Sequence, residues 1–336
     1  MKGGSASVKN IIISRTDSIG DVILTLPLAK ILKDHFPGIR IAFLGKGYTK
    51  AVIESCAFVD EFIEVNDFLT QEVLISGEKP DAIIHVFPVK EIAQRAKSLG
   101  IQTRIGTTNR LYHWLTCNKL VKLSRKNSDL HEAQLNTKLL NPLGIEAGFS
   151  LETLGDSFGF SKIHALSEPL ASLIHPQKFN LILHPRSQGS AREWGLDNFI
   201  ALIRLLPQDQ YKIFISGTAK ERESLDDLFD AAGDLVTDIC GKMDLTMFIA
   251  FINACDGLVA NSTGPLHIAA ALGKKAIGIY PNIRPMHPGR WQPLGPQASY
   301  VTSTQTCAHC KTNPAKCDCM KSIPPSAIIE KLGQKK

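Results

Sequence analysis

The strongest constraint on the fold lies in one short stretch of the last third of the chain. It contains an apolar run at residues 257–260, a small polar turn at 261–264, an apolar segment at 265–272 and a second apolar run at 276–280. Gly273 ends the middle segment, as glycine commonly ends a helix. This order predicts a strand, a helix and a second strand, and a βαβ unit requires a parallel sheet.

The same alternation repeats along most of the chain. We expect further strands at residues 10–14, 39–44, 62–65, 81–86, 102–105, 180–183, 211–215 and 236–238. We expect further helices at residues 22–36, 48–56, 90–99, 130–140, 196–206, 221–232 and 244–254. Strands and helices in alternation predict an α/β protein with doubly wound parallel sheets.

The length of the chain predicts two domains. A chain of 336 residues is too long for one compact core of typical size. The alternation weakens between residues 107 and 175, so we place the boundary within 167–178 and divide the chain into 1–170 and 171–336. Two Rossmann-like halves that face each other across a cleft are the architecture that follows.

Charge and hydropathy exclude several classes of protein. No apolar run approaches the roughly 18 residues that span a bilayer, and the first residues lack the apolar core of a signal peptide, which predicts a cytoplasmic protein without a transmembrane segment. The net charge of +6 comes without the basic, aromatic-interleaved runs of a nucleic-acid binder. A mildly basic surface suits an anionic substrate or an acidic membrane face.

The turn at residues 261–264 has the chemistry of a phosphate site. Pro265 suits the first helical turn, and Ser262 or Thr263 can cap the helix. The N–H groups of that turn would face outward at the carboxyl end of a strand, where open α/β sheets place phosphate groups. His267 falls in the same turn and could reach a bound anion. The alternative is an ordinary capped helix packed on a sheet.

The first strand of the chain leads into a second small-residue turn, at residues 15–21. Gly20 permits close approach of a substrate, and Asp21 presents a carboxylate where the next helix begins. Asp21 is equally well explained as an acidic residue that favours the positive end of the helix dipole.

The loop after the first strand of the second half offers hydroxyls and a guanidinium. These groups suit a diphosphate, and they come from His184, Ser187, Ser190 and Arg192. The alternative is a surface ion pair beside a packed indole.

The next turn of the second half is a further candidate for donor binding. Gly217 and Thr218 follow a strand, and Glu221 lies near the start of a helix, so the three residues could hold a nucleoside. Glu221 can also be a simple first-turn acid.

Taken together, these motifs resemble a known family. The stretches SIGDVILTLPLAK, HPRSQGSAREW, SGTAKERE and NSTGPLHIAAALG, followed by PGRWQPLGP, are similar in order and spacing to glycosyltransferase family 9, the ADP-heptose:lipopolysaccharide heptosyltransferases. The resemblance implies a GT-B fold with the acceptor held by the N-terminal domain and ADP-heptose by the C-terminal domain. It also implies a lipid A-core acceptor (Kdo or heptose) at the inner face of the inner membrane.

The resemblance assigns roles to the first turn. It implies inverting transfer in which Asp21 acts as general base on the acceptor hydroxyl, with Ser18 and Gly20 shaping the acceptor pocket. No Asp-x-Asp motif is present, so we expect metal-independent catalysis that requires no cofactor.

On the donor side, the family commonly has a lysine where Arg192 stands, and arginine keeps the charge. Thr263, Gly264 and His267 match the diphosphate-binding turn of the family. Ser262 departs from the pattern, because the family usually has an aspartate there that would contact the donor sugar. Leaving-group stabilisation would fall on Arg192 and the helix N-terminus.

A late cysteine cluster stands apart from these motifs. Four thiols crowd into 13 residues, at Cys307, Cys310, Cys317 and Cys319. Four thiolates can hold a structural zinc ion, although the usual pair of CxxC motifs is absent. His309 is a substitute ligand, and reduced thiols or a disulfide are the alternatives.

Three other functions fit parts of this pattern. The first is a GT-B transferase with another nucleotide sugar or acceptor, which Ser262 favours. The others are a nucleotide-sugar-binding protein without turnover and a zinc-dependent interaction module on a degenerate transferase. The presence of Asp21 and Arg192 argues against the last two.

Overall fold

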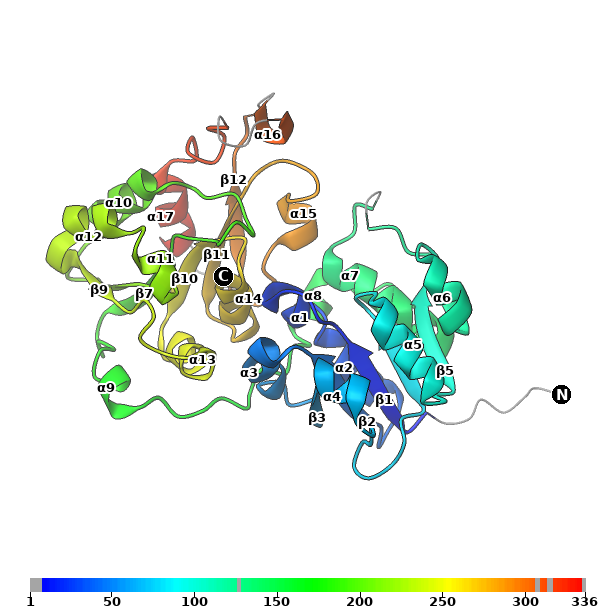
Figure 1. Cartoon of the computed structure of the whole chain (residues 1–336). Coiled ribbons are helices and arrows are strands. Elements are labelled where there is room, and N and C mark those ends of the chain that lie inside the picture. The colour runs from blue at the N-terminus through cyan, green and yellow to red at the C-terminus, as the bar shows by residue number, and fades with distance from the viewer. Residues whose placement is uncertain (1–7, 126–127, 306–308, 313–316, 334–336) are drawn as a thin grey trace. The chain divides into compact units, whose positions relative to one another are not determined.

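The computed structural model describes residues 8–125, 128–305, 309–312 and 317–333. The chain divides into two compact units, Met1–Lys162 and Ile163–Lys336 (Figure 1). The division falls eight residues before the boundary drawn from the sequence, because α9 (Glu168–Ala171) belongs to the second unit.

The first unit is built on a six-stranded sheet in which every neighbouring pair is parallel. Its strand order is β3-β2-β1-β4-β5-β6. The strands are β1 (Asn10–Ser14), β2 (Arg40–Gly45), β3 (Glu61–Glu64), β4 (Ala82–His85), β5 (Thr103–Thr107) and β6 (Lys119–Val121).

The connecting helices of this unit are short. They are α1 (Ile19–Ile23), α2 (Pro27–His35), η1 (Gly47–Thr49), α3 (Lys50–Glu54), α4 (Val65–Thr70), α5 (Lys90–Ser98), α6 (Leu111–Thr116), α7 (Glu132–Thr137), η2 (Lys138–Leu143) and α8 (Leu151–Gly155). The prediction of one helix over residues 22–36 is wrong, since α1 and α2 are separate. Pro27 has no N–H to continue the helix, and the Thr25 hydroxyl donates to the Asp21 carbonyl at 2.8 Å.

The second unit repeats this plan. Its parallel sheet has the order β12-β11-β10-β7-β8-β9, which is the same succession read from the other edge. The strands are β7 (Phe179–His184), β8 (Tyr211–Ile215), β9 (Val236–Asp238), β10 (Gly257–Asn261), β11 (Lys275–Tyr280) and β12 (Ser299–Thr302). The prediction of doubly wound parallel sheets is therefore confirmed in both units.

The helices of the second unit, after α9, complete the fold. They are α10 (Leu196–Leu205), α11 (Ala219–Arg222), α12 (Asp226–Ala232), η3 (Gly233–Leu235), α13 (Leu245–Ala254), α14 (Gly264–Ala271), α15 (Pro288–Trp291), α16 (His309–Thr312) and α17 (Pro325–Gly333). No helix within the described residues is long and apolar enough to cross a bilayer.

Continuous burial explains why the central strands read as apolar runs. Every residue of β1 and of β10 is buried, as expected where helices cover both faces of a parallel sheet. In the second unit the core includes Trp194 and Phe199, whose rings meet edge to face at 4.9 Å. This packing fixes the position from which the loops at the carboxyl ends of the strands project.

Candidate functional site

Each sheet has a point where the strand order reverses, and open α/β sheets bind ligands there, outside the carboxyl ends of the strands. In the first unit this point lies between β1 and β4, and in the second between β7 and β10. The turn at residues 15–21 follows β1. The loop at 185–194 follows β7, and the turn at 262–264 follows β10. Most of the predicted site residues therefore gather at these two points.

A buried arginine organises the turn after β1. The side chain of Arg15 is only 3% exposed and forms ion pairs with three carboxylates. Its Nε donates to Asp17 at 2.6 Å, one Nη to Glu132 at 3.1 Å, and the other Nη to Asp21. Burial alone would lower the pKa of Arg15, but the three carboxylates raise it above its usual value.

A second arginine extends this network toward β4. Arg125 donates to Glu132 at 2.8 Å and to the Val86 carbonyl, just beyond β4, at 3.1 Å. The Asn136 side chain accepts from Arg125 at 3.1 Å and donates to the Leu24 carbonyl at 3.2 Å. These hydrogen bonds therefore connect α7 to the segments that follow β1 and β4, on both sides of the switch point.

Asp21 is held at the edge of this network. One carboxylate oxygen accepts from Arg15, and the other accepts from the hydroxyl of Ser18, an exposed residue, at 2.6 Å. The Ser18 hydroxyl also caps α1, by accepting from the Asp21 N–H. The Asp21 side chain is 16% exposed. One of its oxygens is held by the buried Arg15 and the other by the exposed Ser18. Gly20 is buried in α1 between them.

Asp17 shares the same arginine and has a carboxyl group of a different character. Burial raises the pKa of Asp17, while Arg15 opposes this shift and the charge of Asp21 adds to it. The exposed hydroxyl of Tyr48 donates to the Asp17 carbonyl. Two carboxylates of the same turn, those of Asp17 and Asp21, thus pair with one guanidinium.

Sequence reasoning did not assign functions to Arg15, Asp17 or Glu132. Arg15 and Asp17 were visible in the RTDSIGD turn, and a charged pair directly after a buried strand is a usable signal. Glu132 lies 117 residues from Arg15 in a region of weak patterning, so only the fold brings the two together.

In the second unit a single amide connects the two loops of the switch point. Asn261, the last residue of β10, donates to the Pro185 carbonyl at 2.9 Å and accepts from the Trp194 N–H at 2.9 Å. It is fully buried. Both ends of the loop at 185–194 are therefore attached to the strand that leads into the turn at 262–264. This residue was predicted only as part of that turn.

The N-terminus of α14 has no side-chain cap. Thr263 occupies the N-cap position without a side-chain cap hydrogen bond, and Pro265 lies in the first turn, so the expected capping by a hydroxyl is not observed. The Thr263 hydroxyl is buried and has no hydrogen-bond partner among the residues the structure describes. First-turn N–H groups have no partner within a helix, so Gly264 and Leu266, on either side of Pro265, present donors at the positive end of α14. His267 is buried in the next turn.

The predicted hydroxyls of the loop after β7 shape the loop itself. The Ser187 hydroxyl donates to the Ala191 carbonyl at 3.1 Å, and the Ser190 hydroxyl donates to the Ser187 carbonyl at 2.7 Å. His184 ends β7 with its Nδ1 2.9 Å from the Ser216 hydroxyl. Burial lowers the pKa of His184, and the charges of Glu221 and Glu193 oppose this shift. Their roles in donor binding stay predictions.

Arg192 is half-buried near the end of this loop. Its Nη2 donates to the Cys310 carbonyl at 3.4 Å, a long hydrogen bond, and no carboxylate is paired with it in the part of the chain that the structure describes. The surface ion pair considered from the sequence instead joins Glu193 to Arg186 at 3.0 Å. The Arg192 guanidinium therefore keeps donors for an anion.

The turn after β8 has a clear structural role. Thr218 caps α11, and Glu221 accepts from the Thr218 N–H at 2.7 Å, which completes a capping box. Gly217 lies directly before the cap, and a side chain at Gly217 would meet the Glu221 carboxylate at 3.5 Å. This arrangement accounts for Glu221 as a helix-start residue and leaves its role toward a nucleoside a prediction.

Ser262 has a partner of its own. Burial raises the pKa of the Tyr280 phenol, and a hydrogen bond with the Ser262 side chain opposes this shift. The Tyr280 hydroxyl donates to the Trp291 carbonyl at 2.5 Å. An aspartate at this position would therefore lie beside a phenol.

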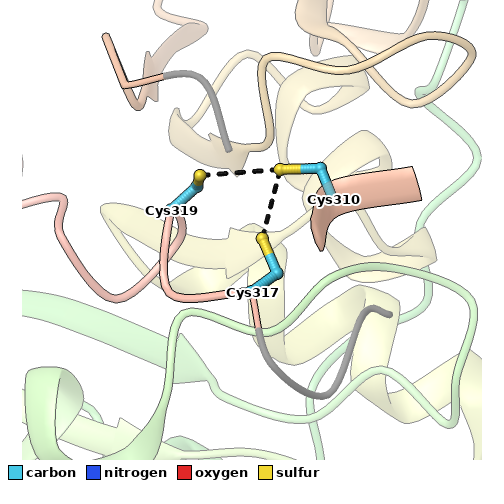
Figure 2. Close-up of side chains that lie close together, drawn as sticks. All are labelled: Cys310, Cys317 and Cys319. Atoms are coloured by element: carbon cyan, nitrogen blue, oxygen red, sulfur yellow. Dashed lines mark hydrogen bonds between the residues drawn. The ribbon is translucent and has the colours of Figure 1, made fainter. Parts of the chain in front are cut away.

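The late cysteine segment gathers thiols in space (Figure 2). The Cys310 Sγ lies 3.2 Å from that of Cys317 and 3.5 Å from that of Cys319, and all three sulfurs lie within 4.8 Å of one another. Neither measured distance is the roughly 2.05 Å of a disulfide. Cys307 lies outside the described residues, and His309 begins α16.

Known proteins are similar to this chain along most of its length. A protein of Haemophilus influenzae with a provisional glycosyltransferase assignment is 26% identical over 302 residues, covering 85% of this chain and 86% of the relative. Lipooligosaccharide heptosyltransferase 2 of Campylobacter jejuni is 23% identical over 323 residues, covering 94% and 95%. The structure of E. coli ADP-heptose LPS heptosyltransferase II superposes with a TM-score of 0.72 at 18% identity, covering 96% and 97%.

The structural likeness identifies the fold as GT-B-like. The model of glycosyltransferase family 9 (heptosyltransferase) matches residues 96–321, which span most of the second unit and the last part of the first. The resemblance carried by the sequence motifs is thereby confirmed: this chain belongs to glycosyltransferase family 9, the heptosyltransferases.

Proposed function

We propose that this enzyme transfers heptose from ADP-heptose to a Kdo or heptose residue of an inner-core lipopolysaccharide acceptor, with inversion at the transferred carbon. Family membership supports transfer of heptose in lipopolysaccharide synthesis. The donor, the acceptor and the stereochemical course are the proposed part.

The observation that carries the donor half is the open N-terminus of α14. A buried Thr263 hydroxyl without a described partner, next to first-turn N–H groups, is a site that a diphosphate would complete. Arg192 would hold the same group from the loop after β7, which Asn261 attaches to the strand before α14. His184, Gly217 and Glu221 would border the nucleoside.

In the acceptor half, Asp21 supplies the base. A sugar hydroxyl is a poor nucleophile until its proton is removed during attack. As the acceptor oxygen bonds to the heptose carbon, the bond from that carbon to the ADP oxygen breaks and the hydroxyl proton passes to Asp21. The carboxylate oxygen beside Ser18 is the one placed for this, because Arg15 holds the other.

Departure of ADP requires stabilisation of negative charge on the diphosphate. Arg192 and the positive end of α14 supply it in this proposal, so the reaction needs no catalytic metal. Because the acceptor is attached to lipid A, the enzyme would work as a peripheral protein at the inner face of the inner membrane.

Calorimetric titration with ADP, UDP and GDP tests the donor. We expect ADP to bind and UDP and GDP to bind at least about tenfold more weakly. Arg192→Ala should weaken ADP binding, whereas Arg204→Ala, which removes an exposed guanidinium of α10, should leave it unchanged. Tighter binding of UDP than of ADP would overturn the choice of donor and favour a GT-B transferase for another nucleotide sugar.

A further inference from the structure

The cysteine cluster offers a metal site that the transfer reaction does not use. Tetrahedral zinc with sulfur ligands at about 2.3 Å places neighbouring sulfurs about 3.8 Å apart. The three described sulfurs, 3.2 and 3.5 Å apart and all within 4.8 Å, approach that spacing. Cys319 is buried and the other two are half-buried, so the cluster lies at the protein surface with its deepest member shielded from solvent.

The backbone around the cysteine cluster is hydrogen-bonded to the end of the loop after β7 and to the start of α10. The Arg192 guanidinium donates to the Cys310 carbonyl at 3.4 Å. The Trp194 indole donates to the Ile323 carbonyl at 2.8 Å, and the Asn198 amide donates to that of Lys321 at 2.9 Å. The segment that contains the thiols is therefore joined at three points to residues 192–198.

We propose that Cys310, Cys317 and Cys319 bind one transition-metal ion of the zinc type, and that this metal fixes the carbonyl that positions Arg192. Binding replaces the thiol protons with metal–sulfur bonds, and the protons pass to solvent. Without the metal, α16 has little local structure to hold it, because it is a single turn. The metal site itself does not depend on the proposed reaction. The effect on Arg192 rests on the proposed function.

Metal content of the purified full chain tests the site. We expect about one equivalent of zinc, or of another metal that prefers thiolates, by elemental mass spectrometry. Cys317→Ser should lose most of it, whereas Cys317→His should retain it, because histidine is also a zinc ligand. Cys255→Ala, which removes a buried thiol at the end of α13, is the matched control and should keep the metal.

Circular dichroism of Cys317→Ser separates loss of the metal from loss of the fold. Wild-type protein with under 0.1 equivalent of metal after growth in zinc-supplemented medium would overturn the proposal. Equal metal content in Cys317→Ser would do the same, as would a count of reacting thiols under denaturing conditions that shows the cluster cysteines joined by disulfides.

ADP affinity then tests the link to Arg192. Removal of the metal by a chelator should weaken ADP binding in wild-type protein by at least about threefold and have no further effect in Arg192→Ala. Cys317→His should restore wild-type affinity. A chelator effect of the same size in Arg192→Ala would refute the positioning role. A protein that contains metal but binds no ADP would refute the proposed donor and leave the metal site standing.

The first unit has an exposed apolar surface on α6. Helix α6 exposes three large apolar side chains, with 88% of Leu111, 59% of Trp114 and 75% of Leu115 accessible to solvent. Their spacing places them on one face of the helix, while His113 and Thr116 are buried on the other. Lys97 of α5 donates to the Leu115 carbonyl at 2.9 Å, so the neighbouring helix (Figure 1) fixes the end of α6.

Positive charge surrounds this apolar face. Residues 82–128 contain nine of the 38 lysines and arginines but only one of the 32 acidic residues, so the rest of the chain has 29 basic residues against 31 acidic ones. The net positive charge of the chain therefore resides in this segment. Its exposed members include Lys97 of α5, Arg110 directly before α6, and Lys119 three residues after α6.

We infer that α6 and the basic residues around it bind the surface of an anionic phospholipid bilayer. Tryptophan and leucine insert at the boundary between headgroups and acyl chains, and lysine and arginine attract anionic headgroups. A single helix of six residues buries little apolar surface, so both contributions are needed and binding should be weak and sensitive to salt.

Sedimentation with vesicles tests this surface and requires neither donor nor acceptor. We expect binding to vesicles with 30% phosphatidylglycerol, no binding to pure phosphatidylcholine, and loss of binding in 0.5 M salt. Leu115→Ser should weaken binding at least about fivefold, whereas Leu205→Ser, at a leucine of α10 that is 58% exposed, should not change it.

Three results would overturn the proposal of a lipid surface. These are equal binding to neutral vesicles, equal binding of Leu115→Ser, and a dimer in sedimentation velocity that Leu115→Ser disrupts. The last would show that α6 joins two copies of the chain.

Discussion

Replacement of Asp21 by asparagine separates a catalytic base from a structural carboxylate. Asparagine keeps an oxygen for the Ser18 hydroxyl but cannot accept a proton at neutral pH and loses the ion pair with Arg15. Loss of a general base lowers kcat by about 10² to 10⁴, which corresponds to about 2.7 to 5.5 kcal/mol in activation free energy. We therefore expect a kcat at least about 100-fold below wild type.

Asp21→Asn should also lower the free energy of unfolding, but only moderately. Arg15 keeps Asp17 and Glu132 as partners, so no unpaired charge is left buried. The loss is that of one hydrogen bond between charged groups, about 1.5 to 3 kcal/mol in the free energy of unfolding. The variant should therefore fold and should bind ADP with nearly wild-type affinity.

Asp17→Asn is the matched control, because Asp17 pairs with the same guanidinium at 2.6 Å and is similarly accessible, with 22% of its side chain exposed against 16% for Asp21. Both variants should lose comparable stability in urea denaturation. Only Asp21→Asn should lose turnover in a single-turnover assay of heptose transfer. Equal losses of turnover in the two variants would show that the network around Arg15, and not a base at Asp21, supports the reaction; wild-type turnover in Asp21→Asn would remove the residue from the mechanism.

Three further outcomes follow from the described contacts. Arg192→Ala should raise the Kd for ADP at least about tenfold and also lower kcat, since a charge-assisted bond contributes about 1.5 to 3 kcal/mol; calorimetry and steady-state kinetics check this, and unchanged affinity would leave Arg192 without a role in binding. Ser262→Asp should raise kcat/KM for ADP-heptose several-fold, because the sugar hydroxyls can donate charge-assisted hydrogen bonds to the new carboxylate; a clear loss relative to Ser262→Ala would indicate another donor sugar. Burial lowers the pKa of His85 to about 3, so the unfolded chain binds a proton between pH 6.5 and 3 that the folded chain does not, and stability falls as pH falls through 6.5. Between pH 7 and pH 5 this histidine alone should remove about 2 kcal/mol, and a His85→Leu variant with the same pH dependence in urea denaturation would contradict that.

The sequence determines the sheets well because their central strands are buried on both faces. The runs NIIIS of β1 and GLVAN of β10 are short and almost entirely apolar, and such runs are typical of strands covered by helices on both sides. Edge strands carry a weaker signal. Of the four edge strands, β3 and β9 were predicted, whereas β6, three residues long with an exposed lysine, and β12, with an exposed tyrosine, were missed.

The candidate site is predictable to the extent that it is local. Thr263 and Pro265 can be predicted from a short motif, because one turn and the helix that follows it supply the backbone N–H groups. The partners of Arg15 cannot be read in this way. Glu132 lies far along the chain, and neither periodicity nor spacing indicates that a buried guanidinium would recruit it.

The two hydrogen bonds of Asn261 also determine which part of the protein can vary. They hold Pro185 and Trp194, so the eight residues between them form a closed loop whose ends stay fixed whatever the loop contains. In the proposed function this loop presents groups to the nucleotide sugar, so we expect substitutions, insertions or deletions within 186–193 to change those groups without shifting β7 or α10. If the proposed donor role holds, we expect exchange of this loop between related enzymes to alter donor preference and to leave the folding of the unit intact, provided that Asn261 is kept.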